Sequence, residues 1–409
     1  MSVSYSLKEL LVKPLSSILN NKNMDMTDEL ESLKLNHNRW RHRGQNYSII
    51  KYDKDYMNYD LVNTTGLLRS LICKNGKIMS FSPPKSQQYC LFKKMYPIQE
   101  CHGEEFIEGT MINLFFDKDL EDDGDWEITT KSNIGARICF FKTGAYEYEK
   151  SFRYMFLDVC QSVGLDFDTL PKEYCYSFVF QHPNNRIVIP FTEKKLYLIK
   201  VYQIDNLEYN VAEIPRENIV AYLKNTTVRF PENIPLISYQ DLEAEINDLS
   251  DYKNVGTMIY HTKSGTRTKY RNPAYEEIRL LRGNQPKLQY RYLELRKMDK
   301  LNEYLKYFPE ARFDCAKYRE QLYSYTRNLH SNYVRCYVKK EKPLKQFPHQ
   351  YRIHMFSLHQ IYLENTNNII NFNRVKTYIN DISVSTLMYS LNYNLRKQTE
   401  ETNAADAIK

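Results

Sequence analysis

Glycine placement is the feature that most limits how this chain can fold. All 12 glycines lie between Gly44 and Gly283, and residues 284–409 contain none. Glycine serves tight turns and strand irregularities and weakens helix interiors. We therefore expect the glycine-bearing part to consist of strands joined by turns, and the glycine-free part to consist of helices.

Hydrophobic periodicity supports this division. Before Gly283, apolar and polar residues alternate in segments such as "EEFIEGTMINLFF", "EYCYSFVFQ" and "KLYLIKVYQI", a pattern typical of strands. From Leu288 to Phe308 and from Tyr318 to Tyr337, apolar residues recur every three or four positions, which predicts helices. The predicted fold class is α+β, with an antiparallel-sheet domain followed by an all-α domain.

The change of period and the polar ends of the chain set the expected domain boundaries. We predict an N-terminal extension over residues 1–45, a sheet domain over 46–285, a basic helical domain over 286–395 and a polar tail over 396–409.

Composition excludes several classes of protein. No stretch approaches the run of about eighteen apolar residues that a membrane span needs, and residues 1–19 lack the pattern of a secretion signal. The eight cysteines never occur at the two-residue spacing of a zinc knuckle or a redox pair. We therefore expect a cytoplasmic protein without membrane contact and with reduced cysteines.

Positive charge is concentrated in the last third of the chain. Residues 1–250 contain 29 Lys and Arg against 35 Asp and Glu, whereas residues 251–400 contain 27 against 13. Such cations, interleaved with tyrosines, suit a polyanion, because Lys and Arg contact phosphates while aromatic rings can stack on bases. The alternative is that they solvate the outer faces of helices. The candidate RNA-binding residues are Arg291, Arg296, Lys297, Lys300, Lys339 and Lys340.

Two motifs suggest a metal site at first inspection. The segment "DKDLEDDGDW" begins like an EF-hand loop, but Thr130 stands where the final glutamate is required, so an acidic hairpin turn at Asp123 and Gly124 is favoured. His349, His354 and His359 are spaced by five residues, which rotates successive side chains by about 140° around a helix. They cannot share one helical face, and we predict no metal site.

Four segments occur in an order that is more specific than any single motif. They are "TGLLRSLICKNGKIMSFSPPKS", "EEFIEGTMINLFF" leading to "WEITTKSNIGA", "YSFVFQHPNNRIVI" and "NVGTMIYHTKSGTRTKYRNPAYEEIRLLRG". Over residues 46–300 this order resembles the adenylyltransferase (nucleotidyltransferase) domain of phage-type RNA ligases and their relatives in large DNA viruses. The helical region is similar to the C-terminal region of those viral relatives.

The resemblance implies a site that has lost its nucleophile. In this family a lysine attacks the α-phosphate of ATP, assisted by a metal and by basic groups. That lysine aligns with Phe106, while Glu108 and Gly109 align with the Asp and Gly of the Lys-x-Asp-Gly motif. Two further acidic positions align with Val179 and Val255. Phenylalanine cannot form a phosphoramidate, and the three apolar residues predict a cavity that is filled by side chains.

The aligned positions that remain charged are mostly basic. The candidate nucleotide- or phosphate-binding residues are Lys269, Arg271, Arg186, Glu108, Lys85 and Arg69. The structural alternatives are that Lys269 and Arg271 face solvent, that Arg186 braces its own turn, that Glu108 is a surface carboxylate and that Phe106 belongs to the core.

A further lysine motif lies near the start of the sheet domain. The sequence "KYDK", Lys51 to Lys54, resembles the Lys-x-Asp-Gly motif, but Lys54 replaces the glycine and we interpret the segment as a strand.

Three hypotheses follow. The first is a catalytically inactive, RNA-ligase-like protein of a large DNA virus, without a cofactor, that acts as an RNA-binding or assembly module in the host cytoplasm or the virion and has RNA and viral or host proteins as partners. The second is an active RNA ligase or related nucleotidyltransferase with a displaced lysine, which would use ATP and Mg²⁺. The third is a structural virion protein that uses the fold for protein contacts.

Overall fold

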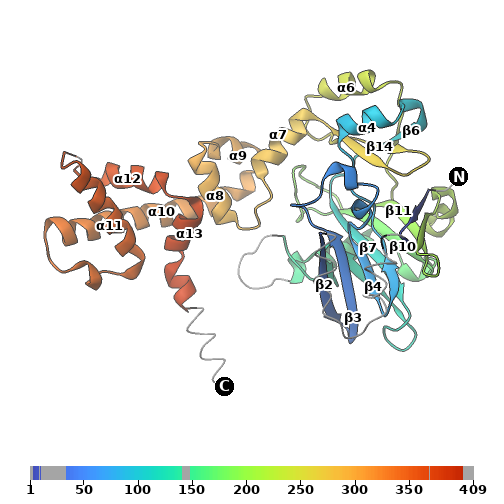
Figure 1. Cartoon of the computed structure of the whole chain (residues 1–409), viewed down its shortest axis with the longest axis horizontal. Coiled ribbons are helices and arrows are strands. Elements are labelled where there is room, and N and C mark those ends of the chain that lie inside the picture. The colour runs from blue at the N-terminus through green and yellow to red at the C-terminus, as the bar shows by residue number, and fades with distance from the viewer. Residues whose placement is uncertain (1–2, 9, 11–33, 141–147, 368, 399–409) are drawn as a thin grey trace. The chain divides into compact units, whose positions relative to one another are not determined.

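The computed structural model describes residues 3–8, 10, 34–140, 148–367 and 369–398. The chain divides into two compact units, which we call unit 1 and unit 2, and the main division falls between Leu280 and Leu281 (Figure 1). Unit 1 contains three antiparallel sheets, and unit 2 is helical. The α+β fold class predicted from the sequence is therefore confirmed.

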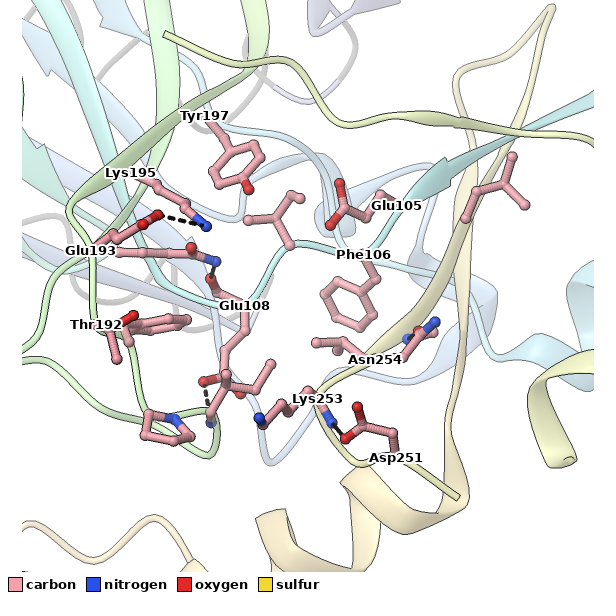
Figure 2. Close-up of a pocket in the computed structure, with 18 residues that line it drawn as sticks. Glu105, Phe106, Glu108, Thr192, Glu193, Lys195, Tyr197, Asp251, Lys253 and Asn254 are labelled. Atoms are coloured by element: carbon pink, nitrogen blue, oxygen red, sulfur yellow. Dashed lines mark hydrogen bonds and ion pairs between the residues drawn. The ribbon is translucent and has the colours of Figure 1, made fainter. Parts of the chain in front are cut away.

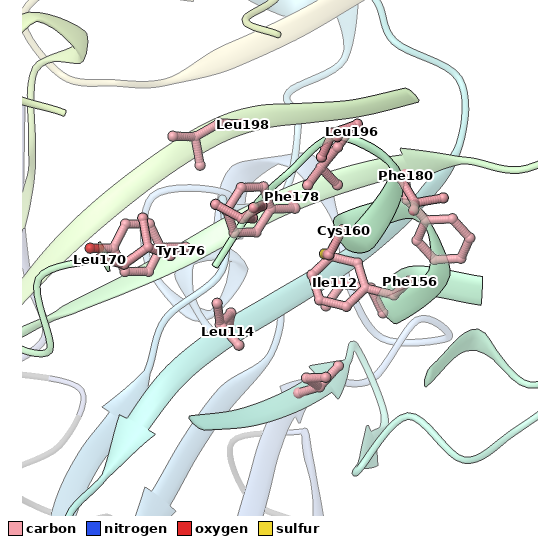
Figure 3. Packing of buried hydrophobic residues seen from close by; sticks show 14 of the residues in the cluster. Ile112, Leu114, Phe156, Cys160, Leu170, Tyr176, Phe178, Phe180, Leu196 and Leu198 are labelled. Atoms are coloured by element: carbon pink, nitrogen blue, oxygen red, sulfur yellow. The ribbon is translucent and has the colours of Figure 1, made fainter. Parts of the chain in front are cut away.

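The largest sheet of unit 1 has seven strands, and all of its neighbouring strands are antiparallel. In order across the sheet, they are β1 (Ser4–Ser6), β12 (Asn210–Glu213), β11 (Lys195–Asp205), β10 (Tyr174–Gln181), β7 (Thr110–Asp117), β8 (Asp125–Thr130) and β9 (Asn133–Ile134). Helix α5 (Phe152–Ser162) packs on this sheet, where Phe156 and Cys160 meet Phe178 and Phe180 in a buried aromatic core (Figure 3).

A second, four-stranded sheet runs β2 (Leu35–His42), β3 (Gln45–Tyr52), β4 (Leu71–Lys74) and β5 (Lys77–Ser80). The turn between β4 and β5 contains Asn75 and Gly76, both with positive φ, as an Asn-Gly hairpin requires. The predicted N-terminal extension needs correction. The strands β1 and β2 fall within residues 1–45, but they pair with β12 and β3 of unit 1.

The third sheet runs β13 (Asn233–Ile234), β6 (Cys101–Glu105), β14 (Gly256–His261) and β15 (Arg267–Arg271). Helices α4 (Tyr89–Met95) and α6 (Tyr239–Asn247) cover it, and their residues Phe92 and Leu242 belong to the same buried cluster as Ile259 of β14. Helix α7 (Pro273–Arg282) follows β15.

The predicted acidic hairpin is confirmed. Asp117 at the end of β7 pairs with Asp125 at the start of β8, and Gly124 in the turn has a φ of +80°. The Asp117 carboxylate is buried, and it accepts hydrogen bonds from Lys74 Nζ at 2.6 Å and from Tyr47 Oη at 2.5 Å. This acidic segment therefore serves to join two sheets.

Unit 2 is a helical bundle. Its helices are α8 (Leu288–Lys297), α9 (Leu301–Tyr307), α10 (Arg312–Tyr333), α11 (His349–Glu364), α12 (Phe372–Asp381) and α13 (Val384–Leu391), and a π-helical turn, Val334–Val338, extends α10. The three histidines of α11 point to different neighbours. His349 stacks on Tyr393, His359 stacks on Tyr337, and buried His354 hydrogen-bonds with Tyr378 and Ser390.

Candidate functional site

Phe106 lies in the connection between β6 and β7, where the sheets of unit 1 approach one another. Its backbone N–H donates to the Gly256 carbonyl at 3.1 Å, which ties the end of β6 to the start of β14. The side chain is half-buried and borders two cavities. Phe106 is therefore half-buried at the border of two cavities and is not a fully buried core residue.

The smaller cavity, which we call the basic cavity, has a volume of about 190 Å³. Its wall is rich in cations, because alternate residues of β15 point to one face of the sheet. The charged residues that line it are Arg69, Lys85, Glu105, Arg267 and Lys269. Val179 completes the wall, packed with Ile107, Tyr197 and Ile199.

Lys269 lies beside Phe106 in the wall of the basic cavity. Its Nζ lies 6.0 Å from the centroid of the Phe106 ring, and the Cζ of Arg271 lies 5.4 Å from the same centroid. Burial, then the charges of Arg271, Arg267, Arg69 and Lys85, lower the pKa of Lys269 to about 7. Lys269 and Arg271 thus both lie beside Phe106, and neither side chain is fully exposed.

The two arginines of the basic cavity are held by the same loop. Arg267 donates to the carbonyl oxygens of Pro83 (3.1 Å) and Pro84 (2.9 Å), and Arg69 donates to that of Pro83 at 3.4 Å. Burial and the charge of Arg267 lower the pKa of Arg69 to about 10. The carbonyl oxygens of Pro83 and Pro84 therefore orient these guanidinium groups. The charge of Arg267 opposes the charged form of Arg69.

The larger cavity has a volume of about 470 Å³ and lies on the other side of Phe106. Figure 2 shows the Phe106 ring directed into it, with Glu105, Glu193, Lys195, Asp251 and Lys253 also along its wall. This wall carries both signs of charge, and Lys195 pairs with Glu193 at 3.3 Å. Val255 and Phe191 add apolar surface.

The three apolar replacements do not close one space. Phe106 borders both cavities, whereas Val179 lines only the basic cavity and Val255 only the larger one. The predicted side-chain-filled cavity is therefore wrong in part: Phe106 separates two open spaces.

Glu108 is a buried carboxylate, and the alternative of a surface residue was wrong. Its Oε1 accepts hydrogen bonds from the backbone N–H groups of Val188 at 3.0 Å and Ile189 at 2.9 Å. The pKa of Tyr275 is raised, mainly by burial and then by the negative charge of Glu108 and the hydrogen bond between the two side chains. Glu108 thus orders the segment that leads into β11, beside the larger cavity.

Arg186 contacts its own turn. Its Nε donates to the Val188 carbonyl at 3.0 Å. Arg186 is not among the described residues that line the two cavities. This contact matches the bracing role that was the alternative for this residue.

The sequence interpretation missed three charged residues. Arg267 and Glu105 line the basic cavity, and burial raises the pKa of Glu105. Lys131 directly follows β8, and burial, then Arg69, Lys54, Lys51 and Lys85, lower its pKa to about 7. A lysine at the end of the segment "WEITTKS" was the available signal, but only the fold brings it to the other cations.

The predicted RNA-binding residues of unit 2 differ in their contacts and exposure, and Lys297 is both hydrogen-bonded and exposed. Arg291 donates to the Leu281 carbonyl and to Glu294, Arg296 donates to Asn380, and Lys297 donates to the carbonyl oxygens of Asp381 and Ile382. These contacts hold the bundle together. The exposed residues of the set are Lys297, Lys300, Lys339 and Lys340.

In the described parts of the chain, no three His, Cys, Asp or Glu side chains converge as a metal site would require. None of the described helices has the length and apolar character needed to cross a membrane.

Sequence comparison links the chain to an RNA ligase. No family model matches. The RNA ligase of Rhodothermus phage RM378 is 25% identical over 141 residues, which are 34% of this chain and 31% of the phage protein. The chain therefore spans about a third of the length of this relative. The match confirms the predicted resemblance to RNA ligases, and the chain is RNA-ligase-like.

Solved RNA ligase structures also resemble the chain. An archaeal ATP-dependent RNA ligase aligns with a TM-score of 0.40 and 12% identity, covering 75% of this chain and 81% of its own. A Naegleria gruberi RNA ligase mutant solved with ATP and manganese aligns with a TM-score of 0.34 and 12% identity, covering 60% of this chain and 76% of its own.

Proposed function

We propose that this chain is a catalytically inactive, RNA-ligase-like protein that binds RNA phosphate groups in the basic cavity of unit 1. The observation that carries the proposal is the set of cations around that cavity, with Phe106 beside them where the resemblance aligns a nucleophilic lysine. The volume of about 190 Å³ suits a phosphate group better than a whole nucleotide, since ligand pockets usually exceed about 300 Å³.

The electrostatic cost of the cavity supports an anionic ligand. Gathering like charges in a partly desolvated place destabilises the folded protein, and perturbed pKa values cluster at functional sites. The four charged groups that most affect Lys269 are all cations. A bound phosphate would offset this repulsion and would restore the ordinary pKa of the lysine.

Loss of catalysis is supported by the side chains around Phe106. A phenylalanine offers no atom that attacks phosphorus, and Val179 and Val255 stand at positions that the resemblance aligns with acids. Removal of one member of a catalytic unit already costs most of its activity, so three replacements favour a binding function.

The test of inactivity is transfer of label from α-labelled ATP to the full-length protein, with magnesium or manganese, followed by a denaturing gel. We expect no labelled band. RNA binding is tested separately by fluorescence anisotropy of a labelled oligoribonucleotide between 50 and about 200 mM salt, and we expect affinity to fall steeply with salt. A labelled band contradicts the inactive assignment, and absence of RNA binding contradicts the binding assignment.

One observation favours an active enzyme with a displaced lysine as the second candidate. Lys269 borders the basic cavity, and with a pKa of about 7 much of it is a neutral amine at physiological pH. In this reaction the amine attacks the α-phosphorus of ATP, the bond to pyrophosphate breaks, and the amine releases a proton to solvent. A labelled band that disappears in Lys269→Arg but persists in the matched surface variant Lys224→Arg would support it.

A further inference from the structure

A second group of cations adjoins the basic cavity. Lys51 is the second-last residue of β3, and Lys54 lies in the turn that follows this strand. Lys131 directly follows β8. Lys51 Nζ donates to Ser132 Oγ at 2.8 Å, which joins the β3 end to the β8 end. Lys131 Nζ donates to Tyr52 Oη at 3.4 Å and lies 4.5 Å from the centroid of the Tyr52 ring.

Arg69 and Lys85 belong to both groups. They line the basic cavity, and their charges also lower the pKa of Lys131. The pKa of Lys85 is in turn lowered by burial and by the charges of Arg69 and Lys54. Arg69 and Lys85 therefore act on Lys269 of the basic cavity and on Lys131 of the second group.

Three carboxylates, Asp53, Asp55 and Asp60, lie in the same segment as Lys54. Asp53 raises the pKa of Lys51, opposing burial and the charge of Lys54, which lower it. However, Asp53 already accepts hydrogen bonds from Asn36 Nδ2 at 3.2 Å and from the backbone N–H of Asp55 at 2.9 Å. The charges that most affect Lys131 are nevertheless those of Arg69, Lys54, Lys51 and Lys85, so cations dominate around this lysine.

Exposed aromatic rings lie in the same turn. Tyr56 is 58% exposed and Tyr59 is 39% exposed. Lys34 Nζ lies 4.7 Å from the centroid of the Tyr56 ring, and Lys85 Nζ lies 5.5 Å from that of Tyr59. Aromatic faces beside cations are the combination that binds unstacked bases and their phosphates.

We propose that Lys51, Lys54, Lys131, Tyr56 and Tyr59 form a subsite for single-stranded RNA that continues from the basic cavity. The lysines contact backbone phosphates and the two tyrosines stack on bases. This inference rests on the proposed function, because both places share Arg69 and Lys85. The "KYDK" segment, which resembles a nucleophile motif, thereby becomes a phosphate-binding segment.

The number and spread of the cations favour a strand over a mononucleotide. Seven cations span the two places, namely Lys51, Lys54, Arg69, Lys85, Lys131, Arg267 and Lys269. A nucleoside triphosphate carries about four negative charges and one base, which leaves cations and a tyrosine unused. In a duplex the faces of the bases are stacked on one another, so exposed tyrosines favour a single strand.

The experiment measures binding of a labelled 12-nucleotide oligouridylate, and of the same strand with abasic sites, to the full-length protein. The variants are Tyr56→Ala/Tyr59→Ala, the conservative Tyr56→Phe/Tyr59→Phe and Lys51→Ala/Lys54→Ala. Tyr222→Ala and Lys224→Ala are matched controls, because both side chains are exposed in unit 1 and take no part in the cluster. Thermal unfolding confirms that each variant folds.

We expect the alanine pair at the tyrosines to weaken oligouridylate binding at least about fivefold and to leave the abasic strand unchanged. The phenylalanine pair should bind like the unmodified protein. The lysine pair should weaken both strands and lower the salt slope by about 1.4, from about 0.7 for each lost single-strand contact.

The outcomes separate this inference from the proposed function. If the unmodified protein binds RNA and both alanine pairs bind equally well, the subsite is wrong and the basic cavity remains the binding place. Equal loss on the abasic strand in the tyrosine variant overturns the stacking role. Equal binding of duplex RNA overturns the single-strand preference. If the unmodified protein binds no RNA at all, the proposed function fails, and the subsite with it.

Discussion

Unit 2 and the basic cavity of unit 1 both contain many cations, but they hold them differently. Residues 281–398 contain 21 Lys and Arg against 9 Asp and Glu. Several of these cations stabilise the bundle: Arg291 bonds to Glu294, Arg335 bonds to Glu341, and Lys297 bonds to the carbonyl oxygens at the end of α12. The charge of unit 2 is therefore partly used by its own structure.

The basic cavity contains fewer cations, yet they act mainly on one another. Lys74 provides a comparison within unit 1, because this buried lysine has Asp117 at 2.6 Å and Asp119 at 3.0 Å. Around Lys269 the strongest charged neighbours are instead Arg271, Arg267 and Arg69. A cation count along the sequence is thus a poor guide to a binding site, whereas cations that the fold gathers in excess of acids are a better one; in the basic cavity four cations stand against Glu105.

The largest expected effect comes from removing two cations of the basic cavity, Lys85 and Lys269, together with Lys131 of the adjoining group. The triple variant Lys85→Ala/Lys131→Ala/Lys269→Ala should bind single-stranded RNA about tenfold to a hundredfold more weakly, with a salt slope lower by about 2. Anisotropy titrations at several salt concentrations measure both quantities. If this variant binds RNA as tightly as Lys224→Ala does, the cations near the basic cavity are no more important for binding than a surface lysine, and the contrast with unit 2 fails.

Phe106→Lys tests how much of the catalytic site is absent. The new amine would lie beside Lys269 and Arg271, so we expect the free energy of unfolding to fall by about 1–3 kcal/mol. We also expect no covalent adenylate, since Val179 and Val255 supply no acid. Denaturant unfolding and α-labelled ATP are the measurements, and a labelled band from this variant would show that those acids are dispensable.

Lys269→Met tests the cost of gathered charge. It should raise the free energy of unfolding by about 1–2 kcal/mol at pH 6, because it removes a desolvated cation. The folded pKa of about 7 lies below the ordinary 10.5, so between these values the unfolded chain binds more protons and the unmodified protein gains stability as pH rises. The advantage of the variant should therefore shrink from pH 7 towards pH 10. An advantage that does not change with pH would contradict the lowered pKa.

The smallest effect is expected in unit 2. The triple variant Lys300→Ala/Lys339→Ala/Lys340→Ala removes exposed cations and should weaken RNA binding by at most about threefold, with unchanged stability. If it matches the loss in the cavity variant, the helical unit is an equal part of the RNA-binding surface.

Local signals predicted much of the fold. Asn75 and Gly76 specify their hairpin through turn chemistry, because both adopt positive φ. The acidic hairpin also forms, but its loop spans residues 118–124, and its positive φ values fall at Glu121 and Gly124. The pairing of Tyr5 with Val211 joins residues about two hundred positions apart, and no local pattern indicates it. The first 45 residues consequently looked like an extension.

The site was predictable only where an aligned motif marks it. The order of segments located Phe106 and Lys269, which the fold brings to one cavity. It missed Lys131, because only the position of this lysine after β8 in the folded chain brings it near the other cations. It also left the burial of Glu108 open, because the hydrogen-bond partners of this carboxylate are backbone N–H groups. Which charged side chains lie near one another depends on the tertiary structure, and the order of segments in the sequence does not show it for individual residues.

The glycines near Phe106 make this position suitable for a chemical probe. Gly109 has a φ of +155°, and an added Cβ would lie 2.5 Å from the Phe180 carbonyl oxygen. Gly256, which accepts the Phe106 N–H, has a φ of +118°, and its added Cβ would lie 2.2 Å from the Tyr270 carbonyl oxygen. The backbone is therefore fixed on both sides of a ring that faces two cavities. A photoreactive benzoylphenylalanine in place of Phe106 would crosslink whatever molecule enters either space, and mass spectrometry of the adduct would identify it.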